Sequence, residues 1–247
     1  MNKIRATAEH IYNSLMGFVY PPQCVICDSL HEGDKFFLCD KCSRSLDFYS
    51  DPYCFKCKKP LDSSTDKCPA CGGSRLISKT WACSSYDDFF RPLIHSFKYQ
   101  GIIPAGRFLS RKLADLMANR LQEKKIDMII PVPLHPLRER KRGFNQSVYI
   151  AEELQNELDI LIDLDVLIRI RRTKDQTGLN REQRKKNMRG AFKINPKADL
   201  EKKRIILVDD VTTSGATASE AARILKEAGA REIQLAVLAI AGHDIQE

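Results

Sequence analysis

The sequence predicts an α/β fold with a mainly parallel sheet, preceded by a small cysteine-rich module. From about residue 80 onward, short apolar runs alternate with amphipathic stretches, a pattern typical of parallel strands covered by helices. Before residue 80, eight of the nine cysteines form four Cys-x-x-Cys pairs. We therefore expect an N-terminal helix at 1–20, a cysteine module at 21–78 and the α/β domain at 79–247.

The composition favours a soluble protein with an anionic partner. A length of 247 residues suits one α/β domain with an appendage, and 43% hydrophobic residues support a core. No long uncharged apolar run follows the basic start, so we expect no transmembrane segment and a cytoplasmic location. The net charge of +8 suits a phosphorylated metabolite, nucleic acid or a membrane surface, although solvated lysines account for it equally well.

An apolar stripe at helical spacing occupies the N-terminal segment. Its members are Ile4, Ala8, Ile11, Leu15 and Phe18. A helix docked on its own protein is the favoured interpretation, and a helix lying on a membrane surface is the alternative.

The four cysteine pairs predict two structural Zn²⁺ sites. Each pair places two ligands on one tight turn, and two pairs complete a tetrahedral site with no open position. Disulfides are not expected in a reducing cytoplasm. Sequential and cross-braced pairing of the turns both remain open. The predicted ligands are Cys24, Cys27, Cys39, Cys42, Cys54, Cys57, Cys68 and Cys71, and the ninth cysteine, Cys83, is expected to be a small buried hydrophobe.

The α/β part is expected to contain five strands and four helices. Strands are predicted at 80–86, 126–132, 166–170, 204–208 and 233–240, and helices at 91–99, 104–124, 143–158 and 217–228. Gly229 would end the last helix. In such folds, ligands bind at the carboxyl ends of the strands.

The most informative motif follows the strand 204–208. Two carboxylates, Asp209 and Asp210, come directly after it, and then a turn rich in hydroxyl groups leads through Gly215 into a helix. Backbone N–H groups and the helix N-terminus suit a phosphate, while the carboxylates suit a sugar diol or a metal ion. An ordinary acidic turn or a Walker-B-like strand end is the alternative, but no Walker A motif occurs in the chain.

This segment resembles the motif that binds 5-phosphoribosyl-1-pyrophosphate (PRPP) in type I phosphoribosyltransferases. The resemblance implies that Asp209 and Asp210 contact the ribose hydroxyls and that the turn binds the 5-phosphate. The corresponding residues are Val208, Asp209, Asp210, Val211, Thr212, Thr213, Ser214, Gly215, Ala216 and Thr217. It also implies Mg²⁺ that bridges pyrophosphate and ribose oxygens.

Two other segments fit the same fold class. Pro131, Val132, Pro133 and Leu134 end an earlier strand where these enzymes bind pyrophosphate, and a run of basic residues follows them. A surface turn with solvated charges is the alternative. The basic stretch 171–187 corresponds to a loop that closes over the reaction centre, from which Arg172 and Lys174 would act with Asp209 and Asp210 in catalysis.

Several motifs together resemble the ComF family of competence-associated proteins (ComFC/GntX-like) over essentially the whole chain. They are Pro-Val-Pro-Leu-His at 131–135, Arg-Gly-Phe-Asn-Gln at 142–146, Gln-Thr-Gly-Leu at 176–179, the segment from Asn187 to Phe192, and Pro-Gln-Cys-x-x-Cys at 22–27 with its paired ribbons. The resemblance implies a double zinc ribbon ahead of a phosphoribosyltransferase domain. It further implies a role in natural transformation, with single-stranded DNA and DNA-uptake machinery such as a ComF-operon helicase as partners at the inner face of the membrane.

Three functional hypotheses remain. The first is a transferase with an unidentified acceptor, such as a base; the second is a DNA-uptake factor; the third is a protein that senses PRPP without catalysis. The residues expected to contact nucleic acid are Arg140, Lys141, Arg142, Arg181, Arg184 and Lys185. The nearby aromatics Phe144, Tyr149 and Phe192 could stack on bases, but a place in the core is favoured.

Overall fold

The computed structural model describes residues 22–31, 35–62, 65, 67–121, 125–173 and 178–242. The helix predicted at 1–20 lies outside the described residues, and so do Lys174 and the first half of the Gln-Thr-Gly-Leu motif. Within the described part, no helix is both long enough and apolar enough to cross a membrane.

The predicted parallel sheet is confirmed. Its strands follow the order β1 (Thr80–Ser85), β7 (Glu232–Ile240), β5 (Arg204–Val208) and β2 (Met128–Pro131), and every neighbouring pair is parallel. A short fifth strand, β6 (Val211–Thr212), pairs with the end of β7. The carboxyl ends of β2 and β5 therefore lie side by side, which places the segments after residues 131 and 208 at one edge of the sheet.

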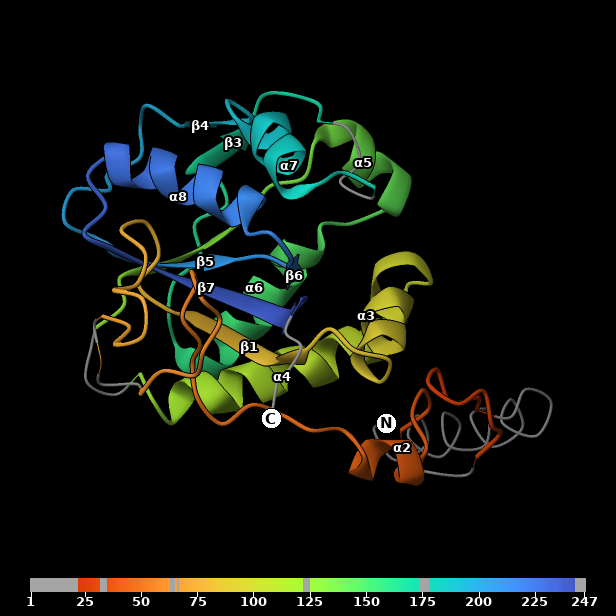
Figure 1. Ribbon diagram of the computed structural model, residues 1–247. Helices are drawn as coiled ribbons and strands as arrows, with labels where there is room; N and C mark the ends of the chain where they lie inside the picture. The colour runs from red at the N-terminus through yellow and green to blue at the C-terminus, as the bar shows by residue number, and fades with distance from the viewer. Residues whose placement is uncertain are drawn as a thin grey trace, which may run out of the picture.

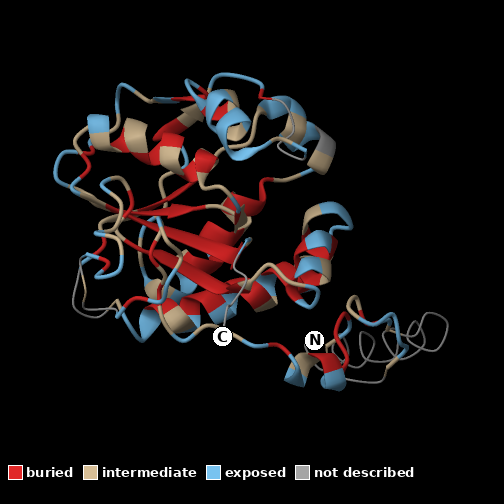
Figure 2. Cartoon of the chain, viewed as in Figure 1, coloured by how far each residue is buried: buried red, intermediate tan, exposed pale blue. Residues whose placement is uncertain are grey.

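Helices cover both faces of the sheet (Figure 1). On one face lie α4 (Ile103–Ala118) and α6 (Gln146–Leu158), and on the other lies α8 (Ala216–Glu227). In β5, Ile206 and Val208 belong to the core on the α4–α6 side, whereas Ile205 and Leu207 belong to the core on the α8 side. Successive side chains on a strand point to opposite faces, and Figure 2 shows the strands of the sheet buried. Because both faces are buried, the strand is a continuous apolar run from Ile205 to Val208.

Three shorter helices contribute residues to a cavity at the carboxyl ends of the strands: α3 (Phe90–Tyr99), α5 (Pro136–Arg142) and α7 (Arg181–Met188). Sequence patterns missed α5 and α7 because charged residues occupy most of their positions and leave no apolar stripe. For these two helices, the capping residues indicate a helix more strongly than the apolar pattern does. Asn180 and Gln183 form a capping box at the start of α7, and Gly143, with φ of 85°, ends α5.

The strand predicted at 166–170 forms, but outside the parallel sheet. It is β3 (Leu167–Arg169), and it pairs antiparallel with β4 (Phe192–Ile194) in a separate two-stranded sheet. Leu167 and Phe192 of this sheet pack into the core beside α8. A strand of three residues is too short for its hydrophobic alternation to indicate the partner strand, so tertiary packing determines the pairing.

The two halves of the cysteine module pack on different parts of the α/β domain. The first half, which contains the short helix α2 (Asp40–Arg44), contacts α4, where the Phe37 and Phe108 rings lie 6.1 Å apart. The second half joins the sheet edge, because the backbone of Tyr53 exchanges hydrogen bonds of 2.7 and 2.8 Å with Thr80 in β1. It is thereby brought close to the loop after β5.

Candidate active site and metal centres

The eight paired cysteines form two four-sulfur clusters. Cys24, Cys27, Cys39 and Cys42 make one, and Cys54, Cys57, Cys68 and Cys71 make the other, with all sulfurs of a cluster within 4.8 Å of one another. One sulfur–sulfur pair in the first cluster lies 3.8 Å apart, and two pairs in the second lie 3.6 Å apart. A tetrahedral Zn²⁺ with Zn–S bonds of about 2.3 Å requires sulfurs about 3.8 Å apart, so both clusters fit zinc. The pairing is sequential rather than cross-braced.

The first turn of each cluster has the same backbone geometry. In one, the Asp28 N–H donates to the Cys24 carbonyl, and in the other the Lys58 N–H donates to the Cys54 carbonyl. Asp28 and Lys58 both have positive φ, of 57° and 59°. This turn aims two thiolates at one point. Cys83, by contrast, is buried in β1 and donates to the Leu109 carbonyl, as expected of a small core residue, and burial raises the pKa of its thiol.

A cavity of about 1120 Å³ opens at the carboxyl ends of β2 and β5. Its walls come from the loop after β5, the Val132–Leu134 turn after β2, α3, α5 and the segment around Arg172. The predicted strand-end segments thus meet in one site. Pro131 is the buried end of β2, and the buried Asn145 side chain holds the turn by donating to the Val132 carbonyl at 3.2 Å.

The loop from Thr212 to Thr217 has the form of a phosphate-binding turn. Gly215 has φ of 71° and occupies the N-cap position of α8, so the free N–H groups of the first helical turn face this loop. Thr213, Gly215, Ala216 and Thr217 line the cavity. Arg184 of α7 also reaches the loop and donates to the Thr213 hydroxyl at 2.8 Å.

The two acids at the end of β5 have different surroundings. Asp209 accepts hydrogen bonds from the Asp210 N–H at 2.9 Å and from the Ser147 hydroxyl at 3.3 Å. Burial, and then the neighbouring Asp210 carboxylate, raise the pKa of Asp209 to about 7. Asp210 instead forms a 2.7 Å ion pair with Lys98 of α3. Lys98 and Ser147 were missed because neither belongs to a motif near residue 209.

The cavity wall is strongly basic. Among the described residues that line it, two acids face six basic side chains, which are Lys98, Arg138, Arg142, Arg169, Arg172 and Arg184. Arg169 also braces the site, since it donates to the Thr173 hydroxyl at 2.6 Å and to the Pro133 carbonyl at 3.4 Å. Burial lowers the pKa of Arg169 to about 10. A pocket with this excess of cations suits a ligand with several phosphate charges.

The residues predicted to contact nucleic acid divide into three groups. Arg142 and Arg184 line the large cavity, and Arg181 lines a second, smaller cavity. Arg140 and Lys185 are exposed, and Lys185 lies 3.2 Å from Glu182. The side chain of Lys141 lies outside the described part of the structure.

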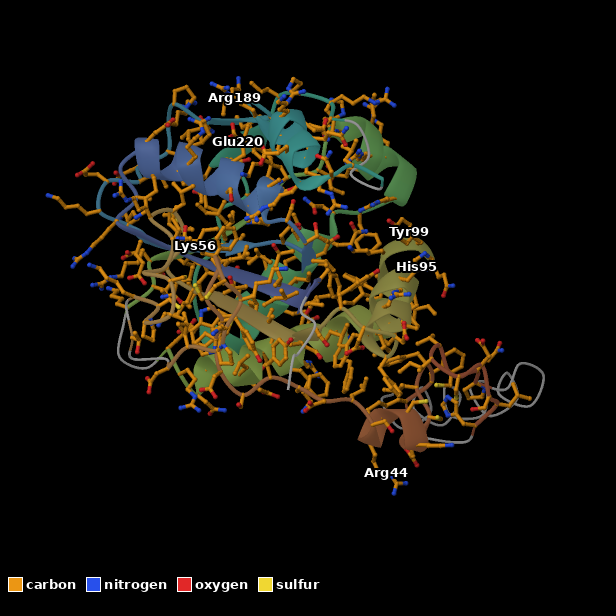
Figure 3. The ribbon with its side chains drawn as sticks, viewed as in Figure 1. Arg44, Lys56, His95, Tyr99, Arg189 and Glu220 are labelled. Atoms are coloured by element: carbon orange, nitrogen blue, oxygen red, sulfur yellow. The ribbon has the colours of Figure 1, made fainter. Side chains whose placement is uncertain are left out.

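The nearby aromatic residues have core contacts, as favoured from the sequence. Phe144 and Tyr149 each lie 5.4 Å from the Phe97 ring, and Phe192 is buried. Tyr99 and His95 of α3 are labelled in Figure 3. Tyr99 is exposed and lines the cavity, and the Arg142 guanidinium lies 5.1 Å from its ring.

Two family models match separate parts of the chain. Residues 103–247 match the family described as phosphoribosyl transferase domain, and residues 15–72 match the double zinc ribbon domain. Competence protein F of Haemophilus influenzae is 32% identical over 218 residues, covering 86% of this chain and 94% of the relative. The DNA utilization protein YhgH of Shigella flexneri is 30% identical, covering 87% and 95%.

Two further matches are more distant. Competence protein ComFC of Streptococcus pneumoniae is 27% identical, covering 83% of this chain and 88% of the relative. Among solved structures, the purine phosphoribosyltransferase from Pyrococcus horikoshii is 26% identical, covering 54% of this chain and 74% of that chain, with a TM-score of 0.34.

The sheet order, the acidic strand end and the phosphate-type turn define a phosphoribosyltransferase domain of type I, joined to a double zinc ribbon. On its identity to competence protein F and YhgH over most of its length, the chain belongs to the ComF family.

Proposed function

We propose that the chain binds PRPP in the large cavity and acts as a ComF-type phosphoribosyltransferase-like protein in natural transformation. The observation that carries the proposal is the meeting of Asp209 and Asp210, the 212–217 loop and six basic side chains in one cavity. The competence-related names of the relatives support the biological role.

Each part of the cavity suits one part of PRPP. The Asp209 and Asp210 carboxylates would accept hydrogen bonds from the ribose hydroxyls, and the 213–217 loop with Arg184 would bind the 5-phosphate. The pyrophosphate would lie at the Val132–Leu134 turn, near Arg138, Arg169 and Arg172. The carboxylate oxygens are ligands that Mg²⁺ accepts, and the ion would neutralise charge on the pyrophosphate.

A transferase reaction in this site would break the bond between C1 of the ribose and the pyrophosphate oxygen. Pyrophosphate would leave with the bonding electrons, and an acceptor atom would form the new bond to C1 and release its proton. The basic wall would stabilise the charge that develops on the leaving group. Calorimetric titration with PRPP and Mg²⁺ tests the binding; no saturable heat would refute the proposal.

Arg184→Gln is expected to weaken PRPP binding by about 10- to 100-fold, because it removes one charge-assisted contact to the 5-phosphate. Lys185→Gln is the matched control: Lys185 is adjacent on α7 but exposed and paired with Glu182. If both variants bind PRPP equally well, Arg184 does not contact the phosphate.

We further propose that single-stranded DNA contacts the basic exterior next to the cavity. Arg140 and Lys185 are exposed on α5 and α7. These two helices lie near each other (Figure 1), and both contribute residues to the cavity wall. Neutralising both is expected to weaken the binding of an oligothymidylate and to reduce its salt slope by about 0.7 per lost phosphate contact. A control variant, Lys41→Gln on α2 in the first ribbon, should leave the slope unchanged. An unaltered slope in the double variant would place the DNA contact elsewhere.

A further inference from the structure

The position of α7 does not follow from an apolar face of its own. Of its eight residues only Met188 is buried, and it packs into the core beside α8. A helix of this length is marginal in water unless tertiary contacts hold it. Yet α7 carries Arg184, whose guanidinium donates to the Thr213 hydroxyl of the 212–217 loop at 2.8 Å. Contacts elsewhere on α7 must therefore fix where this arginine lies.

Two charged side chains hold the carboxyl end of α7. Arg171 donates to the Asn187 and Arg189 carbonyls, at 2.6 and 2.7 Å. Glu220 of α8 accepts the N–H of Gly190, the residue after the C-cap of α7, at 2.7 Å. Arg189 and Glu220 are labelled in Figure 3, where this end of α7 meets α8. The end of α7 is thus joined to α8 by a carboxylate.

Glu220 is a buried carboxylate with a fixed orientation. Only 8% of the residue is exposed, and Arg223 of the same helix donates to both of its carboxylate oxygens, at 2.8 and 3.1 Å. These hydrogen bonds lower the pKa of Glu220, so its carboxyl group is ionised at neutral pH. A hydrogen bond from an N–H to an ionised oxygen is stronger than one to a neutral oxygen. The contact with Gly190 is therefore a strong link between the two helices.

The helix that holds α7 also begins at the 212–217 loop. Gly215 of this loop is the N-cap of α8. Glu220 follows Gly215 by five residues, which corresponds to about 7.5 Å along the helix axis. One helix thus connects the loop to the end of α7, so the contact at Gly190 helps to set how far Arg184 lies from the loop.

We propose that Glu220 is a positioning residue for PRPP binding: through Gly190 it holds α7 where the Arg184 guanidinium reaches the 212–217 loop. Glu220 lines neither the large nor the small cavity, so its carboxylate acts on a ligand only through α7. The inference rests on the proposed function, because Arg184 is assigned there to the 5-phosphate.

The test is the effect of Glu220→Gln on PRPP affinity, measured by calorimetry of the zinc-loaded full chain with Mg²⁺. Glutamine keeps the side-chain shape but has a single acceptor oxygen and no charge, so Gly190 and Arg223 compete for that oxygen. The dissociation constant for PRPP should rise about three- to tenfold. Glu227→Gln is the matched control and should bind as the wild type does, because Glu227 also pairs with Arg223, at 2.6 and 2.7 Å, but is exposed and lies about two turns farther along α8.

A double-variant cycle with Arg184→Gln separates positioning from a general loss of structure. If Glu220 acts through Arg184, Glu220→Gln has no further effect on PRPP affinity in the Arg184→Gln background. An equal loss of affinity in both backgrounds would overturn the inference, because the loss would not pass through Arg184.

Hydrogen exchange of the ligand-free protein gives a second measurement. Amides of α7 should exchange faster in Glu220→Gln than in Glu227→Gln, because only the first substitution weakens the contact with Gly190. Equal exchange in the two variants contradicts the inference. If the wild type shows no saturable PRPP binding, the proposed function itself fails. If the wild type binds PRPP and Glu220→Gln binds it equally well, only the role of Glu220 is refuted.

Discussion

Asp209→Asn combined with Asp210→Asn is expected to lower PRPP affinity by about 100-fold or more. The double variant replaces two charged acceptors, each worth about 1.5–3 kcal/mol in hydrogen bonds to the ribose hydroxyls. The change is isosteric, and both residues line the cavity after β5, so the fold should persist. Calorimetry measures the affinity, and Asp115→Asn on α4, an exposed acid beside Lys112, is the matched control.

The pKa of Asp209 adds a pH dependence with a definite sign. In an unfolded chain its carboxyl titrates near pH 4, whereas in the folded protein burial and Asp210 raise its pKa to about 7. The folded state thus binds the extra proton between these values, and the free energy of unfolding falls as pH rises through that window. Asp209→Asn should therefore stabilise the protein against heat, more at pH 8 than at pH 5.

The same titration affects ligand binding. PRPP affinity of the wild type should increase as pH rises toward about 7 and then level off, because the ribose hydroxyls need an ionised acceptor. Equal PRPP affinity in the double Asn variant and the wild type would refute the assignment of both acids.

Cys54→Ser is expected to remove one of the two zinc ions and to unfold the second ribbon locally. The cluster that contains Cys54 has a small apolar core of its own, formed with Leu61 and Cys68, so the metal supplies most of its folding free energy. Metal analysis should show the zinc content fall by half. Hydrogen exchange should become faster in residues 51–72 and remain slow in β5 and β7.

The matched control for this variant is Cys83→Ala, a buried cysteine that belongs to neither cluster. It should keep both zinc ions. Because Phe55 packs on Gly215, loss of the second zinc should also loosen the 212–217 loop and weaken PRPP binding. Full zinc content in Cys54→Ser, or an absence of zinc in the wild type, would contradict the assignment of this cluster.

Features specified by neighbouring residues were predictable from the sequence. The cysteine turns, the Asp209–Asp210 pair and the helix that begins after Gly215 each depend on a short segment whose backbone geometry follows from its own residues. The parallel sheet was also predictable, because strands buried on both faces must be continuous apolar runs. The sequence pattern did not predict α5 and α7, because these polar helices have no apolar stripe of their own.

Only the tertiary structure decided which distant segments meet. It pairs the cysteine turns sequentially, brings Lys98 to Asp210, and brings Arg184, which the sequence analysis assigned to nucleic acid, to the Thr213 hydroxyl. It also places the second ribbon against the 212–217 loop, which forms the smaller cavity. Such contacts depend on how helices and ribbons pack on the two faces and edges of the sheet, and side-chain charge alone does not indicate whether an arginine faces solvent or a cavity.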